Sequence, residues 1–172
     1  MANFDFKARF ISALPPLPPD LALGEFVAYR YGNLSSLAAQ DAAFLVNQGM
    51  PRDAAPFLSF EAYSEPQVNQ RRVVFGIDAD YFPLGHNGSG DVLAIGCRNR
   101  EIVYFNHDFD NARVFINSTL AQFAECLCVY QAHLRDDRMN SCLAQIARVD
   151  GAAALPGTMW AEDIRASLGA AG

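Results

Sequence analysis

The chain has 172 residues, enough for one domain with a sizeable core, and 51% of them are hydrophobic. Its 13 basic and 19 acidic residues give a formal net charge of −6, which argues against general nucleic-acid binding because that activity needs a basic surface. No stretch reaches the roughly 20 apolar residues of a membrane span, and no targeting segment is recognisable. We therefore expect a single cytoplasmic domain over residues 1–172 that does not bind membranes.

The four cysteines and three histidines lack the spacing of a metal site. Cys126 and Cys128 are two residues apart, which on a helix directs the two thiols to different sides. We therefore expect reduced cysteines in the core, no metal ion and no cofactor.

The first part of the chain shows two helix patterns separated by prolines. Residues 3–13 carry apolar side chains at helical spacing, and the proline-rich run 15–19 ends that helix. This run is expected to be a rigid connector, with a docking peptide as the alternative. Residues 35–48 predict a second helix, capped by Ser35 or Ser36 and ended by Gly49.

Short runs rich in β-branched and aromatic residues predict the strands of a sheet. Residues 96–100 form a hairpin turn in which Asn99 is the residue best suited to a positive φ. The short connections exclude parallel crossovers and predict an antiparallel meander. The expected strands are 57–60, 73–77, 91–95, 101–105 and 112–117.

The last third of the chain has helical patterns. Thr119 and Gln122 have the spacing of a capping box, although Asn117 or Ser118 could cap equally well. Apolar stripes follow over 120–134 and 136–148.

A final helix after Pro156 carries Trp160, Ile164 and Leu168 on one face, with Trp160 as a core anchor. Because strands occur in one run and helices in others, the pattern predicts an α+β fold. We expect an antiparallel sheet of four to six strands with helices packed mainly on one side.

Two polar loops are the candidate functional segments. The loop 85–91 contains three glycines, which allow a partner's backbone to approach closely, and Asp91 is expected to brace it by accepting its backbone N–H groups. This loop lacks the Gly-Lys-Ser/Thr ending of a phosphate-binding loop and precedes a strand, not a helix.

The second loop, 107–111, is rich in Asp and Asn. A calcium loop would need carboxylates at alternating positions and a closing Glu, and neither is present. A hydrolase built on a His–Asp pair and Ser89 would need a Gly-x-Ser-x-Gly elbow between a strand and a helix, which is also missing. We therefore expect a solvated turn and no catalytic residue.

Four segments, in their order along the chain, resemble the SUKH superfamily and in particular its fourth group. The likeness runs from about residue 30 to 135, and Trp160 matches a late helix. One departure is Arg100-Glu101, where the family usually has a glycine in the hairpin turn. The matching segments are the helix ending 45–51 with its Gly-Met-Pro, 74–78 followed by 88–95, the strand 101–108 and the junction 115–123.

The resemblance implies a SUKH-like α+β fold and an immunity protein that binds and neutralises a polymorphic toxin domain delivered by a neighbouring cell. Many such toxins are nucleases, whose basic substrate surfaces would attract an acidic inhibitor. A protein-binding scaffold of the same fold, unrelated to toxins, is the alternative. The resemblance implies no catalytic residues, and the oligomeric state stays open.

The expected partner contacts lie in the two loops and in the aromatic pair before the first of them. Tyr81 and Phe82 would anchor a partner if exposed, or belong to the core if buried. The residues expected to contact the partner are Asp80, Tyr81, Phe82, His86, Asn87, Ser89, Asp91, Asp108 and Asp110.

Overall fold

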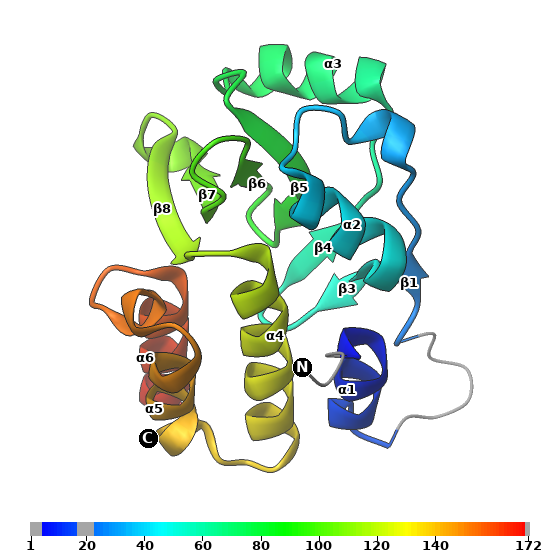
Figure 1. Ribbon diagram of the computed structural model, residues 1–172. Coiled ribbons are helices and arrows are strands. Elements are labelled where there is room, and N and C mark those ends of the chain that lie inside the picture. The colour runs from blue at the N-terminus through cyan, green and yellow to red at the C-terminus, as the bar shows by residue number, and fades with distance from the viewer. Residues whose placement is uncertain (1–4, 17–22, 171–172) are drawn as a thin grey trace.

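The centre of the fold is an antiparallel sheet of six strands, seen in the computed structural model in Figure 1. The structure describes residues 5–16 and 23–170. Each strand of this sheet pairs with the next one along the chain, and a separate pair joins β1 to β2. The strands are β1 (Phe26–Val27), β2 (Met50–Pro51), β3 (Asp53–Ala54), β4 (Leu58–Phe60), β5 (Tyr81–Asn87), β6 (Val92–Gly96), β7 (Ile102–Asn106) and β8 (Ala112–Asn117).

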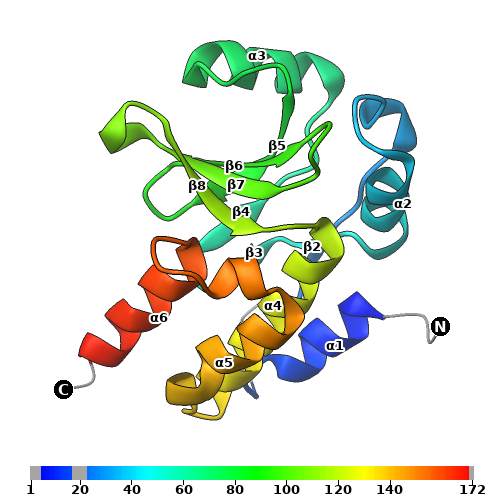
Figure 2. The ribbon, with the colours of Figure 1, turned by 60° about the vertical axis from the view of Figure 1, so that its left-hand side comes forward.

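Helices cover the sheet. Figure 2 shows α1, α4, α5 and α6 below it and α3 above it. The expected α+β fold class, with an antiparallel sheet and helices packed against it, is therefore confirmed. The helices are α1 (Phe6–Ala13), α2 (Ala39–Gln48), α3 (Glu65–Phe75), α4 (Leu120–Arg135), α5 (Met139–Val149) and α6 (Met159–Ala170), with short 3-10 helices η1 (Tyr31–Asn33), η2 (His107–Phe109) and η3 (Gly151–Ala154).

Strand β6 is buried on both faces, as a sheet between helices requires. Leu93 and Ile95 belong to the main core, together with Trp160 from α6. Val92 and Ala94 alternate with them and are buried on the opposite face. Since each fully buried large apolar side chain contributes roughly 1.5–3 kcal/mol, both faces of the sheet favour the folded state.

A buried polar network at the end of β8 joins the sheet to the helices. The Trp160 indole N–H donates to Asn117 Oδ1 at 2.8 Å, and Asn117 Nδ2 donates to Asp150 Oδ2 at 3.0 Å. Asn117 Nδ2 also lies 3.4 Å from the Sγ of Cys126 in α4. The Ser118 N–H and hydroxyl both donate to Asp150, at 2.7 and 3.0 Å. Asn117 is therefore a core residue and not the cap of α4.

Thr119 caps α4, as its spacing from Gln122 predicts. Its side chain accepts a hydrogen bond from the Gln122 N–H at 3.3 Å. In α1, Asp5 is the N-cap, and Pro15 and Pro16 follow the helix. The rest of the predicted connector, 17–19, lies outside the described residues.

The helix expected over 35–48 starts later, at Ala39, so neither Ser35 nor Ser36 caps it. The Leu37 N–H donates to the Leu34 carbonyl at 3.0 Å, and both leucines are buried. Burial of these two side chains holds 34–37 in a separate turn before α2. The predicted end of the helix at Gly49 is confirmed.

The turn between β6 and β7 has its positive φ at Arg100 (64°), so the expectation for Asn99 is wrong. Asn99 Oδ1 instead accepts a hydrogen bond from the Glu101 N–H at 3.2 Å. Arg100 donates two hydrogen bonds, at 2.7 and 2.9 Å, to the buried carboxylate of Asp41 in α2. This paired contact fixes α2 beside the hairpin and offsets the cost of the backbone conformation.

The strand expected over 73–77 is wrong, because 73–75 is the last turn of α3. Ser64 and Gln67 form a capping box at the start of this helix, and Gly76 ends it with a left-handed φ of 63°. These end signals outweigh the β-propensity of the Val-Val-Phe run. Within the segment 73–77, Ile77 is the one buried residue.

Strand β5 is absent from the prediction because Pro83 and Gly85 make its sequence resemble a loop. The pairing with β6 shifts between these two residues, which leaves Leu84 as the extra residue of a bulge. A Cβ on Gly85 would lie 1.9 Å from the Ser59 carbonyl oxygen and 2.9 Å from the Phe60 Cα of β4. Only glycine fits at this close approach.

We expect Gly85→Ala to lower the free energy of unfolding by at least about 3 kcal/mol, the upper end of ordinary overpacking, because the clash is with backbone. Urea unfolding followed by circular dichroism measures this change. Gly32→Ala is the control, since a Cβ there meets no atom within 4 Å. Equal stability of the two variants would contradict the steric argument.

Candidate functional site

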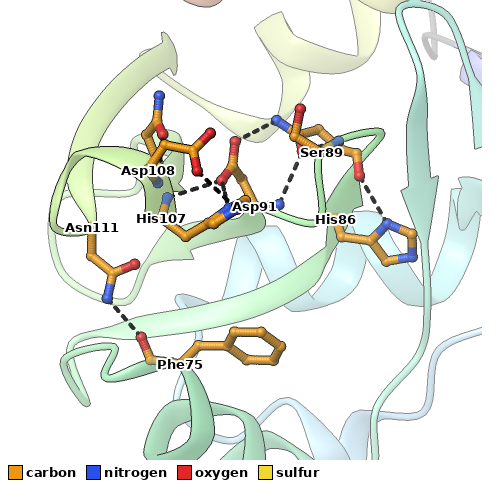
Figure 3. A network of polar contacts seen from close by, with 9 residues as sticks. Phe75, His86, Ser89, Asp91, His107, Asp108 and Asn111 are labelled. Atoms are coloured by element: carbon orange, nitrogen blue, oxygen red, sulfur yellow. Dashed lines mark hydrogen bonds and ion pairs between the residues drawn. The ribbon is translucent and has the colours of Figure 1, made fainter.

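Asp91 joins the two loops predicted to be functional (Figure 3). We call its contacts with Asn87 and His107 the Asp91 clasp. Asp91 Oδ1 accepts a hydrogen bond from the His107 N–H at 3.0 Å and lies 2.5 Å from His107 Nδ1. Its Oδ2 accepts a hydrogen bond from Asn87 Nδ2 at 2.9 Å. Asp91 directly precedes β6 and His107 directly follows β7, so the pairing of these two strands brings the loops side by side.

Asn87 braces the loop 85–91 from within. Its Oδ1 accepts hydrogen bonds from the backbone N–H groups of Ser89 and Asp91, both at 3.0 Å. This is the bracing role expected of Asp91, whose carboxylate instead accepts from the Asn87 side chain and from His107 of the other loop. An Asn at the start of a turn accepts such bonds readily because its side chain mimics the backbone.

Burial alone would raise the pKa of the Asp91 carboxyl, but hydrogen bonds from the His107 N–H, the Asn87 amide and the His107 ring outweigh it. The pKa of Asp91 therefore lies below its ordinary value. Both of its oxygens are engaged and the residue is 5% exposed. Asp91 thus holds the two loops in place, and its burial leaves little of it open to the partner contact expected from the sequence.

The two histidines of these loops are oriented by different groups. His107 Nε2 lies 3.3 Å from Asp108 Oδ1, while His86 Nδ1 lies 3.1 Å from the backbone oxygen of Asn87. The His107 side chain is half-exposed, and His86 lies near the end of β5, where it pairs with Ser59 of β4 and Val92 of β6. The clasp therefore fixes one imidazole at the surface, where it can donate to or accept from a partner.

The remaining residues expected to contact a partner are distributed between surface and core. Phe82 is 1% exposed and belongs to the main core, so its expected role as an exposed anchor is wrong. Tyr81 is half-buried and packs edge-on against Phe105, with ring centroids 5.0 Å apart. The exposed residues are Asp80, which lies 3.4 Å from Arg98, and Ser89, Asp108 and Asp110.

A cavity of about 270 Å³ lies beside the clasp. It is bounded by Asp91 and His107 on one side and by Phe75 at the end of α3 on another. Asn111 closes this end by donating a hydrogen bond to the Phe75 carbonyl at 2.9 Å (Figure 3). The end of α3 and the loop 107–111 are therefore in direct contact.

Exposed apolar side chains at this contact were not predicted as functional. Val73 is 83% exposed, Val74 66% and Phe109 71%. We define the loop face as these three residues with Phe75, Ser89, His107, Asp108 and Asp110. The one sequence signal for this surface is the Val-Val-Phe run itself. The run predicts a buried strand, because a sequence does not distinguish exposed apolar residues from buried ones.

All four cysteines are free: Cys126, Cys128 and Cys142 are buried, and Cys97 is partly exposed. Burial raises the pKa of each of the three buried thiols to about 12. Within residues 5–16 and 23–170 no cluster of three or more His, Cys, Asp or Glu side chains is arranged to hold a metal ion.

No known protein family, curated protein or solved structure matches this chain at a significant level. The likeness to the SUKH superfamily therefore stays a prediction from the sequence. Among the described helices, none is both long enough and apolar enough to cross a membrane.

The Asp91 clasp predicts a pH dependence of stability. Because the folded-state pKa of Asp91 is lowered, its contribution to the free energy of unfolding is complete above its ordinary value of 3.8 and is lost as the pH falls through the folded value. We expect Asp91→Asn to be less stable than the wild type at pH 7 by about 1–3 kcal/mol and to lose less stability on acidification. Urea titrations at several pH values measure both effects.

The exposed Asp110→Asn is the control for that series, because it makes the same chemical change outside the clasp. A pH dependence in Asp91→Asn identical to that of the wild type would show that the clasp does not couple to folding.

The thiols predict a simple reactivity pattern. At pH 8 a thiol with a pKa of about 12 is ionised to only about one part in ten thousand, so Cys126, Cys128 and Cys142 should be inert to an aromatic disulfide reagent. We expect one thiol per chain, that of Cys97, to react quickly with the reagent in the folded protein, and all four thiols to react after unfolding. Cys97→Ser should remove the fast phase, and two or more fast equivalents in the wild type would contradict the assignment.

Proposed function

We propose that this protein is an immunity protein that binds and neutralises a toxin domain, and that a nuclease is the toxin class its charge suits best. The observation that carries the proposal is the exposed Val-Val-Phe run at the end of α3. Apolar side chains of this size are normally buried or scattered singly on a surface. Two adjacent valines in solvent, at the end of a helix that is hydrogen-bonded to the segment carrying the exposed Phe109, favour a protein-binding surface.

The loop face also has the composition of an interface. Val73, Val74 and Phe109 are its most exposed apolar residues, and Phe109 stands in the chain between the exposed Asp108 and Asp110. A hydrophobic centre with a charged rim is the usual anatomy of such surfaces. The acidic rim and the net charge of −6 would speed encounter with a basic partner, and a nuclease presents such a surface to its substrate.

Hydrogen bonds within the two loops favour a binding surface that is already formed before the partner arrives. Asp91 and Asn87 hold the loop 85–91 by side-chain hydrogen bonds, and Asn111 ties the second loop to α3. A surface held in this way loses little conformational freedom on association, which strengthens binding.

The test is affinity capture of the tagged protein from its source organism, followed by assay of the captured protein's toxicity in cells with and without this chain. We expect a captured toxin domain whose killing is relieved. Capture of a complex without toxicity, and no relief by this chain, would replace the immunity role with that of a protein-binding scaffold.

The double variant Val73→Ser, Val74→Ser should weaken binding of the captured partner by about 10-fold or more. Burial of a valine side chain in an interface contributes roughly 1.5 kcal/mol to the free energy of binding. The thermal stability of the double variant should stay close to that of the wild type because both side chains are exposed. Titration calorimetry measures the affinity. Leu155→Ser, an exposed apolar residue elsewhere, is the control, and an equal loss in that variant would remove the loop face from the proposal.

A further inference from the structure

The turn between β3 and β4 projects an aromatic ring into solvent. Phe57 is 83% exposed and has a left-handed φ of 57°, which is uncommon for a residue with a large side chain. Gly88 of the loop 85–91 lies against it, since a Cβ on Gly88 would be 3.0 Å from the Phe57 Cβ. An exposed phenylalanine held in an unfavourable backbone conformation indicates a functional constraint on this turn.

Two cavities with volumes of about 490 and 800 Å³ are both lined by Phe57. Pro56, Phe57, Leu58, Gly88 and Asp163 line both of them, and we call the combined depression the Phe57 groove. Its larger part is bounded by Tyr130 and Leu134 of α4 and Ala166 of α6, and its smaller part by Asn87 and Ser89. Each volume lies within the range of ligand-binding clefts.

The groove is acidic as well as apolar. Asp53, Glu162 and Asp163 line it, and among the described residues no Lys, Arg or His does so. Asp53 accepts a hydrogen bond from Ser59, and Glu162 pairs with Arg165. These two carboxylates therefore already have a hydrogen-bond donor or a cation beside them.

Asp163 is the carboxylate most in need of a cation. Tyr130 donates its hydroxyl to Asp163 Oδ2 at 2.5 Å, and in the described part of the chain no ion pair is formed by this carboxylate. Burial raises the pKa of Asp163, and the hydrogen bond from Tyr130 opposes that rise only in part. A positive charge placed beside Oδ1 would restore stabilisation that burial removes.

We propose that the Phe57 groove binds a positively charged, amphipathic segment of a protein partner, with an apolar side chain against Phe57 and a Lys or Arg at Asp163. A protein segment fits better than a small molecule, because the two cavities together extend from Asn87 and Ser89 to Leu134 and Ala166, a span that an extended occupant can follow. This inference rests on the proposed function in one respect, that the partner is a basic protein.

The first experiment uses a fluorescein-labelled peptide of alternating leucine and lysine as the probe, with fluorescence anisotropy as the readout and the full chain as receptor. We expect Asp163→Asn to weaken binding by about 10-fold or more because it removes a charge-assisted hydrogen bond, and Phe57→Ser to weaken it by a similar factor because it removes the apolar contact. Asp78→Asn is the matched control, because it removes one exposed negative charge outside the groove and the loop face and keeps the oxygen that accepts from the Asp80 N–H. A leucine–glutamate peptide should bind at least 10-fold more weakly than the probe.

Equal losses in Asp163→Asn and Asp78→Asn, or equal binding of the acidic peptide, would overturn the inference, because the affinity would then depend on net charge or on apolar contact alone. Thermal unfolding of each variant verifies its fold. Asp163→Asn retains an oxygen that can accept from Tyr130, which keeps the test valid if Phe57→Ser proves unstable.

The second experiment separates this inference from the proposed function. If the captured toxin is neutralised equally by the wild type, Phe57→Ser and Asp163→Asn, the groove is not the docking site and the immunity role stands. If both variants lose peptide binding while no toxin is captured, the groove stands and the immunity role falls.

Discussion

The buried amide of Asn117 is the interaction on which the relation between sheet and helices depends. It ends β8 and contacts α4 through Cys126, the end of α5 through Asp150 and α6 through Trp160. Without the amide the buried Trp160 N–H would lose its partner, at a cost of about 1–3 kcal/mol, and Asp150 would keep only the hydrogen bonds from Ser118. Because α6 forms one wall of the Phe57 groove, this hub also sets the width of the groove.

The candidate binding surfaces are organised by one rule, that strand pairing brings loops together and side-chain hydrogen bonds then fix them. The register of β6 and β7 places Asp91 beside His107, and β4 pairs with β5 so that Phe57 lies next to Gly88. The loop 85–91 therefore separates the groove from the clasp and contributes to both surfaces. A partner that covers the loop face is thus adjacent to the groove.

Much of the sheet could be predicted from the sequence because β6, β7 and β8 have regular apolar patterns and short turns. The apolar run 73–75 was assigned wrongly because its β-propensity is a local property, while helix α3 is specified by a cap nine residues earlier. The loops of the site were predicted, but the pairing of Asp91 with His107 was not, since sixteen residues separate them and only strand register joins them. Phe57 was missed because its exposure follows from the φ of a single turn residue, which no periodicity reveals.

Trp160 is the only tryptophan of the chain, and it lies fully buried between Asn117 and the rings of Phe123 and Tyr130. Its emission therefore reports a single event, the docking of α6 onto the sheet and α4. Tyr130, whose ring packs at a tilt against this indole, also donates a hydrogen bond to Asp163 in the lining of the groove. The molecule thus contains an intrinsic optical probe that is coupled to one candidate surface through a single side chain, while the loop face has no tryptophan of its own.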